Sequence, residues 1–202
     1  MKLIAIFLLI TLSSIVNADF DDAYGHLKQK EYIKALNEFK PLAEQGHIPS
    51  QMNLGWMHHK GLGVEQNYKT AIKWYEMAAN QDNEDAQHTL GNLYRNGEGK
   101  KDAVTKDLNK AMYYYKKASD NGFPYSTFTI GVMYEKGEGV NKSIKNATKW
   151  FKKTYEHDSV KKKILGLWDS FRITFLLDNY KDIHYKYRLL AHKSLELTRV
   201  EL

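Results

Sequence analysis

A chain of 202 residues without a cysteine can form neither a disulfide bond nor a thiolate metal site, so the packing of apolar side chains must hold it together. Its formal net charge is +6 at pH 7, but basic and acidic residues are interspersed along it. A nucleic-acid site requires a concentrated basic stripe with stacking aromatics. The sequence therefore argues against a disulfide-stapled scaffold and against a nucleic-acid partner.

The first eighteen residues have the organisation of a secretory signal peptide. Lys2 supplies the basic start, residues 3–12 form an apolar run, and Val16-Asn17-Ala18 offers small residues for cleavage. The apolar run is shorter than the roughly 20 residues that span a bilayer, although an uncleaved anchor is the alternative. We therefore expect an exported protein, periplasmic or extracellular, that begins at Asp19 after cleavage near Ala18.

One pattern occurs three times in the rest of the chain: a Leu-Gly or Ile-Gly pair, a Gly-x-Gly loop, and an Ala followed three residues later by an aromatic pair. The copies contain, in order, Leu54-Gly55, Gly61-Leu62-Gly63 and Ala71; Leu90-Gly91, Gly97-Glu98-Gly99 and Ala111; and Ile130-Gly131, Gly137-Glu138-Gly139 and Ala147. Successive Gly-x-Gly loops lie 36 and then 40 residues apart, a period typical of helical solenoids. We therefore predict repeats at residues 48–83, 84–123 and 124–159.

The second repeat indicates that each copy forms a helical hairpin. Its first helix is predicted from a single apolar stripe, which consists of Ala86, Leu90, Leu93 and Tyr94. Its second helix should begin after Asp107, which lies four residues before the repeated Ala, as Asn67 and Ser143 do in the other copies. All three are residue types that favour the N-cap position.

A glycine recurs inside the first predicted helix of each repeat, at Gly55, Gly91 and Gly131. Glycine costs about 1 kcal/mol relative to alanine in a helix interior, so its recurrence indicates a close approach of two helices. We expect the repeated Ala residues to lie opposite these glycines. The aromatic pairs Trp74-Tyr75, Tyr114-Tyr115 and Trp150-Phe151 should then fill the space between hairpins.

The combination of Leu-Gly-x-x-Tyr, Gly-x-Gly and Ala-x-x-Trp/Tyr-Tyr resembles the Sel-one-like repeat (SLR) family, a longer-looped relative of the tetratricopeptide repeat. The resemblance covers residues 48–159. It implies an all-α fold in which antiparallel helix pairs form a right-handed α-α superhelix. It also implies a protein that acts as a scaffold for protein complexes. Residues 19–47 resemble a further tetratricopeptide-like hairpin, whose second helix carries Tyr32, Ala35, Phe39 and Ala43. The sequence departs from the family pattern at His58, which replaces the Tyr, and at residues 102–106, where the second repeat has four extra residues.

The repeat pattern fades after residue 159, but helical periodicity continues. Residues 160–202 are predicted to form capping helices that cover the last apolar face and complete a solenoid of about five hairpins. The alternative is a helix that docks on a partner or a membrane surface, because Lys161-Lys162-Lys163 lies beside many aromatics.

No pattern of catalytic or metal-binding residues is found in the sequence. The Gly-x-Gly loops lack the third glycine and the preceding strand of a dinucleotide site. The adjacent His58 and His59 point about 100° apart on a helix and cannot share a metal ion. Some cysteine-rich relatives in the SLR family are linked to penicillin binding or β-lactam hydrolysis, but this chain has no cysteine and no Ser-x-x-Lys motif. We expect no catalytic residues, no metal and no cofactor.

A binding surface is predicted from the resemblance to tetratricopeptide-type repeats, in which the first helix of each pair lines a concave groove. In each repeat, the two positions that follow each other directly before the repeated Leu or Ile should face this groove, and so should the position directly after the repeated Gly. His59 and Arg95, one helical turn further on, should extend the same face. The resulting set is Met52, Asn53, Trp56, His59, His88, Thr89, Asn92, Arg95, Phe128, Thr129 and Val132. Asn53 and Asn92 could clamp peptide amides, and Trp56 and Phe128 offer apolar anchors.

The function that follows is that of an exported, non-catalytic scaffold or adaptor that binds a protein or peptide. The alternative is a cell-envelope enzyme or glycan-binding factor whose site lies outside recognisable motifs. Peripheral contact with an anionic membrane or wall polymer stays open because the chain is mildly basic.

Overall fold

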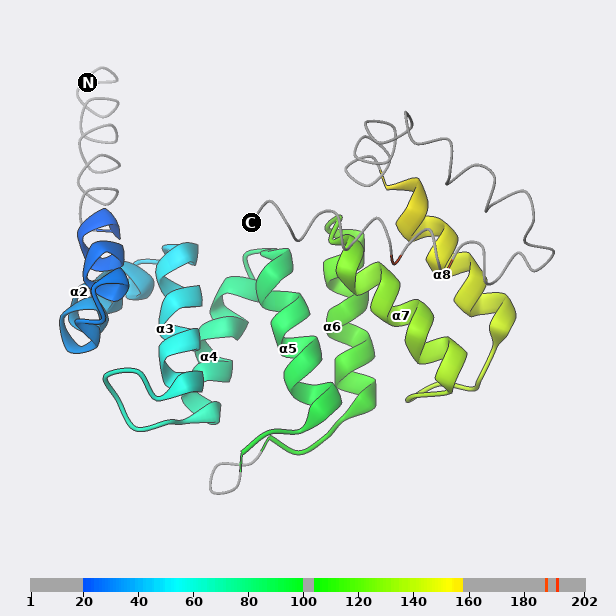
Figure 1. Ribbon diagram of the computed structural model, residues 1–202, viewed down its shortest axis with the longest axis horizontal. Coiled ribbons are helices and arrows are strands. Elements are labelled where there is room, and N and C mark those ends of the chain that lie inside the picture. The colour runs from blue at the N-terminus through cyan, green and yellow to red at the C-terminus, as the bar shows by residue number, and fades with distance from the viewer. Residues whose placement is uncertain (1–19, 100–103, 158–187, 189–191, 193–202) are drawn as a thin grey trace, which may run out of the picture. The chain divides into compact units, whose positions relative to one another are not determined.

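The computed structural model describes residues 20–99, 104–157, 188 and 192. Up to residue 157 it consists of helices joined by loops (Figure 1): a helix at residues 20–28, α2 (Tyr32–Glu44), α3 (Ile48–Lys60), α4 (Tyr68–Ala79), α5 (Glu84–Asn96), α6 (Leu108–Asp120), α7 (Pro124–Lys136) and α8 (Ile144–Glu156). Within these ranges, extended backbone pairs only in a single antiparallel bridge between Glu98 and Val104, in the long loop of the second repeat. The prediction of helices without a sheet is confirmed for this part of the chain. The predicted signal peptide and nearly all of the predicted capping helices lie outside the described residues.

The described residues fall into two compact units, which lie within residues 1–86 with 97–105 and within residues 87–96 with 106–202. In the first unit α3 packs against both α2 and α4. In the second unit α7 packs against both α6 and α8, and Figure 1 shows the ribbons of these helices side by side. Both α3 and α7 thus contact the second helix of their own repeat and the second helix of the preceding hairpin.

The second helices begin at the predicted caps. Asn67, Asp107 and Ser143 have extended backbone, and their side-chain oxygens accept backbone N–H groups two or three residues further on at 2.8 to 3.2 Å. Each cap satisfies donors of the first helical turn that have no partner within the helix. The start of each second helix is therefore determined locally.

Each glycine inside a first helix lies against an aromatic ring of the second helix of its own repeat. A Cβ atom added at Gly55, Gly91 or Gly131 would lie 2.5 to 2.6 Å from the nearest atom of Tyr75, Tyr115 or Phe151, respectively. The rings are almost completely buried, with at most 3% of their surface exposed. The atoms nearest to each glycine thus belong to these rings, and not to Ala71, Ala111 or Ala147, which we expected there. Each of these alanines lies one helical turn before the aromatic residue. The aromatic ring occupies the volume that the absent side chain of the glycine leaves.

The second glycine of a Gly-x-Gly loop joins consecutive hairpins. Gly63 has a φ of 72° and Gly139 a φ of 68°, where residues with a Cβ atom are strained. An added Cβ would also lie 2.8 Å from Tyr32 in the first case and 2.6 Å from Leu108 in the second. Both contacts are with the beginning of the preceding second helix, α2 or α6. Glycine is needed here for its backbone conformation and for its size.

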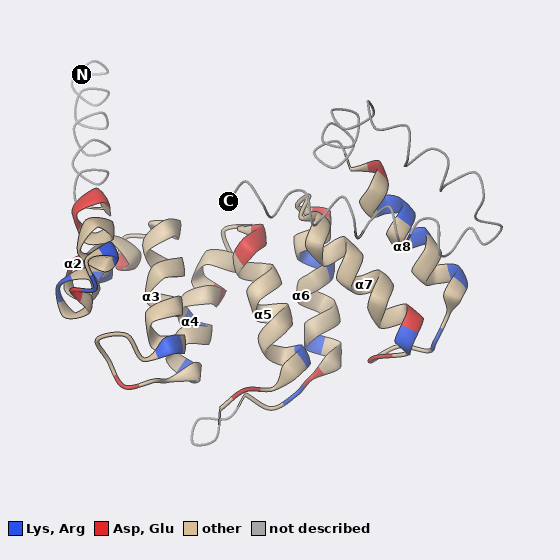
Figure 2. Ribbon diagram, viewed as in Figure 1, with Lys and Arg blue, Asp and Glu red and all other residues tan. Residues whose placement is uncertain are grey.

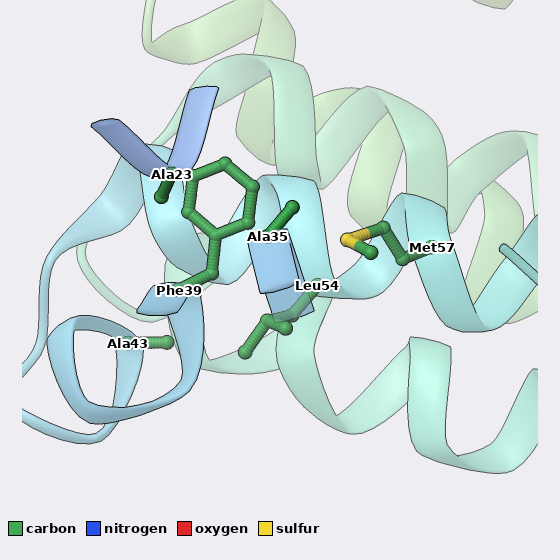
Figure 3. Packing of buried hydrophobic residues seen from close by; sticks show 6 residues of the cluster. All are labelled: Ala23, Ala35, Phe39, Ala43, Leu54 and Met57. Carbon is green, nitrogen blue, oxygen red and sulfur yellow. The ribbon is translucent and has the colours of Figure 1, made fainter. Parts of the chain in front are cut away.

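The N-terminal hairpin shares its core with the first repeat. Figure 3 shows this cluster, in which side chains from the helix at 20–28, from α2 and from α3 meet: Ala23, Ala35, Phe39, Ala43, Leu54 and Met57. All six are at most 1% exposed. The apolar stripe predicted on the second helix of this hairpin is therefore buried, and residues 20–44 pack on the first repeat as a further hairpin.

The contact between Gly91 and Tyr115 predicts a large effect for a small substitution. Gly91→Ala should lower the free energy of unfolding by about 1–3 kcal/mol, because the methyl group overlaps a buried ring and forces the helices apart. The measurement is chemical unfolding followed by circular dichroism.

Gly25→Ala is the matched control, because Gly25 lies in the helix at 20–28 and an added Cβ there meets nothing within 4 Å. This change should leave stability unaltered or raise it by up to about 1 kcal/mol, through the higher helix propensity of alanine. Equal effects of the two substitutions would show that the ring at position 115 does not restrict position 91.

Candidate protein-binding surface

The predicted binding residues lie on the sides of α3, α5 and α7 that the buried Leu-Gly and Ile-Gly pairs leave open. Leu54, Leu90 and Ile130 are at most 1% exposed, whereas none of the eleven predicted residues is fully buried. Trp56 is 41% exposed and the other ten are half-buried. The residues of α3 belong to the first unit, and those of α5 and α7 to the second.

In the first unit the surface centres on Trp56 of α3. Asn53 lies nearly one turn before it, and its side-chain nitrogen donates a hydrogen bond of 2.9 Å to the carbonyl of Pro49. The Asn53 side-chain oxygen is the atom that could accept a donor from a ligand. This surface thus combines an exposed indole ring with a hydrogen-bond acceptor, a combination suited to a peptide with an apolar side chain.

On α5 the histidine is engaged in packing. The Nδ1 atom of His88 lies 2.8 Å from the Ser126 hydroxyl, and its ring centroid lies 5.5 Å from that of Tyr115 and 5.0 Å from that of Phe123. Burial lowers the pKa of His88 to about 4, so the ring is neutral at pH 7. Its structural role is to connect α5 with α6 and α7.

Asn92 and Arg95 on α5 belong to a polar network around Tyr115. The Tyr115 hydroxyl donates to the Asn92 side-chain oxygen at 2.7 Å. Burial raises the pKa of Tyr115 to about 12, while the neighbouring Arg95 acts in the opposite direction. The Nε and Nη2 atoms of Arg95 lie 2.8 and 2.7 Å from one carboxylate oxygen of Glu138. These contacts fix the orientation of both residues and leave the Asn92 side-chain nitrogen as a donor for a ligand.

His59 and Arg95, which we expected to extend the groove, join consecutive repeats. The Nε2 atom of His59 lies 2.9 Å from a carboxylate oxygen of Glu98, and Arg95 pairs in the same way with Glu138. Both glutamates are the middle residues of Gly-x-Gly loops, where the first repeat has Leu62. We missed this pairing in the sequence, although its signal was present: a glutamate in the second and third loops and a basic residue four positions after the preceding Leu-Gly glycine.

On α7 the surface is contacted by the chain's own C-terminal region. The ring centroid of Phe128 lies 5.1 Å from that of Phe151 and 5.9 Å from that of His192. Glu135, which was not among the residues predicted from the sequence, forms an ion pair with Arg188. The Nε atom of Arg188 lies 3.3 Å from a carboxylate oxygen of Glu135. A partner that binds α7 would therefore meet Arg188 and His192 there.

Among the described residues no three His, Asp or Glu side chains are grouped so that they could hold a metal ion. No helix in that part of the chain is both long enough and apolar enough to span a bilayer.

The repeats match one family model three times. The Sel1 repeat is found at residues 48–83, 84–123 and 124–159, which together make up more than half of the chain. The chain belongs to the Sel1 repeat family. Proteins of this family generally act as scaffolds for protein–protein interaction and are generally not catalytic.

Three relatives illustrate the match. Human protein sel-1 homolog 2 is 37% identical over 89 residues, which cover 44% of this chain and 12% of the human protein. An ERAD-associated E3 ubiquitin-protein ligase component of Arabidopsis thaliana is 34% identical over 84 residues, which cover 41% of this chain and 12% of that protein. The third is the crystal structure of a protective antigen of uropathogenic Escherichia coli, which is described as having an SLR fold. It superimposes on this chain with a TM-score of 0.67 and 26% sequence identity, and the match covers 91% of this chain and 38% of the antigen. These matches confirm an all-α helical repeat solenoid, and the chain spans only a small part of its curated relatives.

The half-buried His88, whose ring is neutral in the folded chain, predicts a dependence of stability on pH. Its pKa is about 4 in the folded chain, against 6.5 ordinarily. Between these values the unfolded chain binds a proton that the folded chain does not, so the free energy of unfolding should fall as the pH is lowered from 6.5 to 4. The shift corresponds to a loss of roughly 3 kcal/mol.

His88→Gln keeps a hydrogen-bonding side chain that does not titrate, and should remove this part of the pH dependence. The check is a series of urea unfolding curves for parent and variant between pH 7 and about 4. Parallel pH profiles of the two proteins would show that the His88 ring does not stay neutral in the folded chain.

Proposed function

We propose that this chain is an exported, non-catalytic scaffold that binds a protein or peptide on the open sides of its first helices. The observation that carries the proposal is the exposure of Trp56, 41% of whose surface is accessible on α3. Tryptophan is enriched among the residues that dominate binding energy, because a large ring buried by a partner removes much apolar surface from water. The general role of the Sel1 family supports this assignment.

The chemistry of the surface fits a segment that offers both apolar side chains and backbone amides. Trp56 and the neighbouring Met52 provide apolar contact area, and the Asn53 side-chain oxygen can accept an amide N–H. In the second unit the Asn92 side-chain nitrogen can donate to a peptide carbonyl. Because Tyr115 and Pro49 hold these two amides in position, a partner would bind them with a small loss of side-chain entropy.

Relatives support a role in assembly. The Arabidopsis relative is by its name a component of a ubiquitin-protein ligase, which shows that a protein with such repeats can be part of a larger complex. For this chain the partner is proposed to be a protein or peptide met after export, because residues 1–18 have the pattern of a signal peptide.

The proposed site is tested with Trp56→Ala and Met77→Ala. Both side chains are exposed to a similar degree, 41% and 39%, but Met77 lies on a second helix, α4. A photo-crosslinking residue placed at position 56 in intact cells should first capture the partner, which is then purified. Trp56→Ala should weaken its binding about ten-fold or more, as loss of a central aromatic anchor does.

Met77→Ala should leave binding unchanged within about two-fold, and both variants should melt within a few degrees of the parent because neither side chain is buried. Equal crosslinking from positions 56 and 77, or unaltered affinity of Trp56→Ala, would refute the proposed surface.

Export predicts a defined N-terminus. The protein isolated from its cells should begin at Asp19, since signal peptidase cleaves after small residues such as Ala18. Edman sequencing or intact-mass measurement gives the result directly. A chain that retains residues 1–18 in the membrane fraction would instead identify this segment as an anchor, and a full-length chain in the cytoplasm would refute export.

A further inference from the structure

Among the second helices of the described chain, those of the second unit, α6 and α8, carry the most lysines. Helix α8 carries four lysines and one acidic residue, and α6 carries three lysines and one acidic residue. In the first unit, α4 has two lysines and one acidic residue, and α2 has two of each. Figure 2 shows the blue segments along α8 and α6. The interspersed charges expected from the sequence are therefore found on α2, whereas α6 and α8 have an excess of positive charge.

On α8 the lysines form a stripe on the side away from the core. Lys145, Lys149 and Lys152 follow each other at i, i+4 and i+7, and all three are exposed. The buried residues Ala147 and Phe151 lie on the opposite side of the helix. Residues with this spacing lie above one another on a helix, so the three ammonium groups point in a common direction.

On α6 a second stripe combines lysines with an aromatic ring. Lys110, Tyr113 and Lys117 lie at i, i+3 and i+7, again opposite the buried residues of the helix. Tyr113 is 56% exposed, and the Lys117 ammonium lies 6.0 Å from the centroid of its ring. The stripe therefore presents positive charge together with a ring that has an apolar body and a polar hydroxyl.

The two stripes lie on neighbouring helices, because α6 and α8 touch near their C-terminal ends. Trp150 of α8 packs against a core cluster that α6 and α7 share. The Nζ atom of Lys153 on α8 lies 3.3 Å from the Ser119 hydroxyl and 3.4 Å from Asp120, both on α6. Glu156 in turn pairs with Lys152 at 3.6 Å. The acidic residues of both helices are thus already paired. Five lysines have no acidic partner among the described residues, and these define the α6–α8 surface: Lys110, Lys116, Lys117, Lys145 and Lys149.

We propose that the α6–α8 surface binds the anionic headgroups of a lipid bilayer. The basic residues of both helices are all lysines. Lysine acts as a mobile point charge, whereas arginine is preferred for bidentate recognition of a defined carboxylate or phosphate. A diffuse negative surface suits such a pattern, and each basic residue strengthens binding to it roughly five-fold. Tyr113 and Ile144, 56% and 45% exposed, can enter the interfacial region.

The surface includes no residue proposed for partner binding, so this inference stands apart from the proposed function. A protein that rests on a bilayer through α6 and α8 would keep α5 and α7 available to a partner. An acidic polypeptide is the competing ligand, and the experiment below includes it.

The test is co-sedimentation of the protein, isolated from cells and with its N-terminus sequenced, with phosphatidylcholine vesicles that contain none or about 30% phosphatidylglycerol. We expect binding to the anionic vesicles alone, reduced about ten-fold or more when salt is raised from about 0.05 M to about 0.5 M. Lys145→Gln with Lys149→Gln should reduce the partition coefficient about ten-fold or more, since two of the five unpaired charges are removed.

Lys69→Gln with Lys73→Gln is the matched control. These lysines occupy the same positions relative to Ala71 on α4 as Lys145 and Lys149 do relative to Ala147, and both are exposed. The control should change partitioning by less than about two-fold, and circular dichroism should show both variants to be folded. Equal losses in the two variants, binding to neutral vesicles, or binding of soluble polyglutamate without binding of anionic vesicles would each overturn the proposal.

Discussion

The contact between a helix glycine and an aromatic ring is the interaction on which each repeat depends. At Gly91 the α-carbon leaves room for the Tyr115 ring, whose nearest atom lies 2.6 Å from where a Cβ would be. The same geometry recurs at Gly55 and Gly131. A glycine in a helix costs stability by itself, so it is retained because the buried ring removes more apolar surface from water than a methyl group could. The contact also fixes the rotation of each first helix, and hence which residues lie on its open side.

Polar and charged contacts join consecutive repeats, in addition to the glycine contacts within each repeat. In the first unit His59 pairs with Glu98, and in the second Arg95 pairs with Glu138, so that the end of one first helix is tied to the loop of the next repeat. Partly buried ion pairs contribute little net stability, because desolvation offsets much of their attraction. Their contribution is to register, because the glutamate between the two loop glycines meets its partner only when the next hairpin is correctly placed.

The two helices of a repeat therefore have different exposed chemistry. The open sides of α3, α5 and α7 carry aromatic, amide and hydroxyl groups, many of which are held by neighbouring side chains, as Asn92 is by Tyr115. The outer sides of α6 and α8 carry unpaired lysines and Tyr113. The acidic residues of these two helices, Asp120 and Glu156, are paired with Lys153 and Lys152, so the remaining lysines have no acidic partner among the described residues. In the second unit, a scaffold that binds a partner on α5 and α7 and an anionic surface on α6 and α8 is consistent with this division.

The sequence by itself determined the helical hairpins, because their signals are local. Caps such as Asn67, the stripe around Leu90 and the loop glycines act within a few residues of themselves, and their three-fold recurrence identified the repeat. Tertiary structure alone decided what each glycine contacts: Tyr115 opposes Gly91, although Ala111 was the sequence-based expectation. It also decided that His59 and Arg95 join repeats, that Arg188 reaches Glu135, and that the lysine stripes of α6 and α8 lie on neighbouring helices. Such pairs are separated by 24 or more residues, and a distance along the chain does not specify a distance in space until the packing of the helices is known.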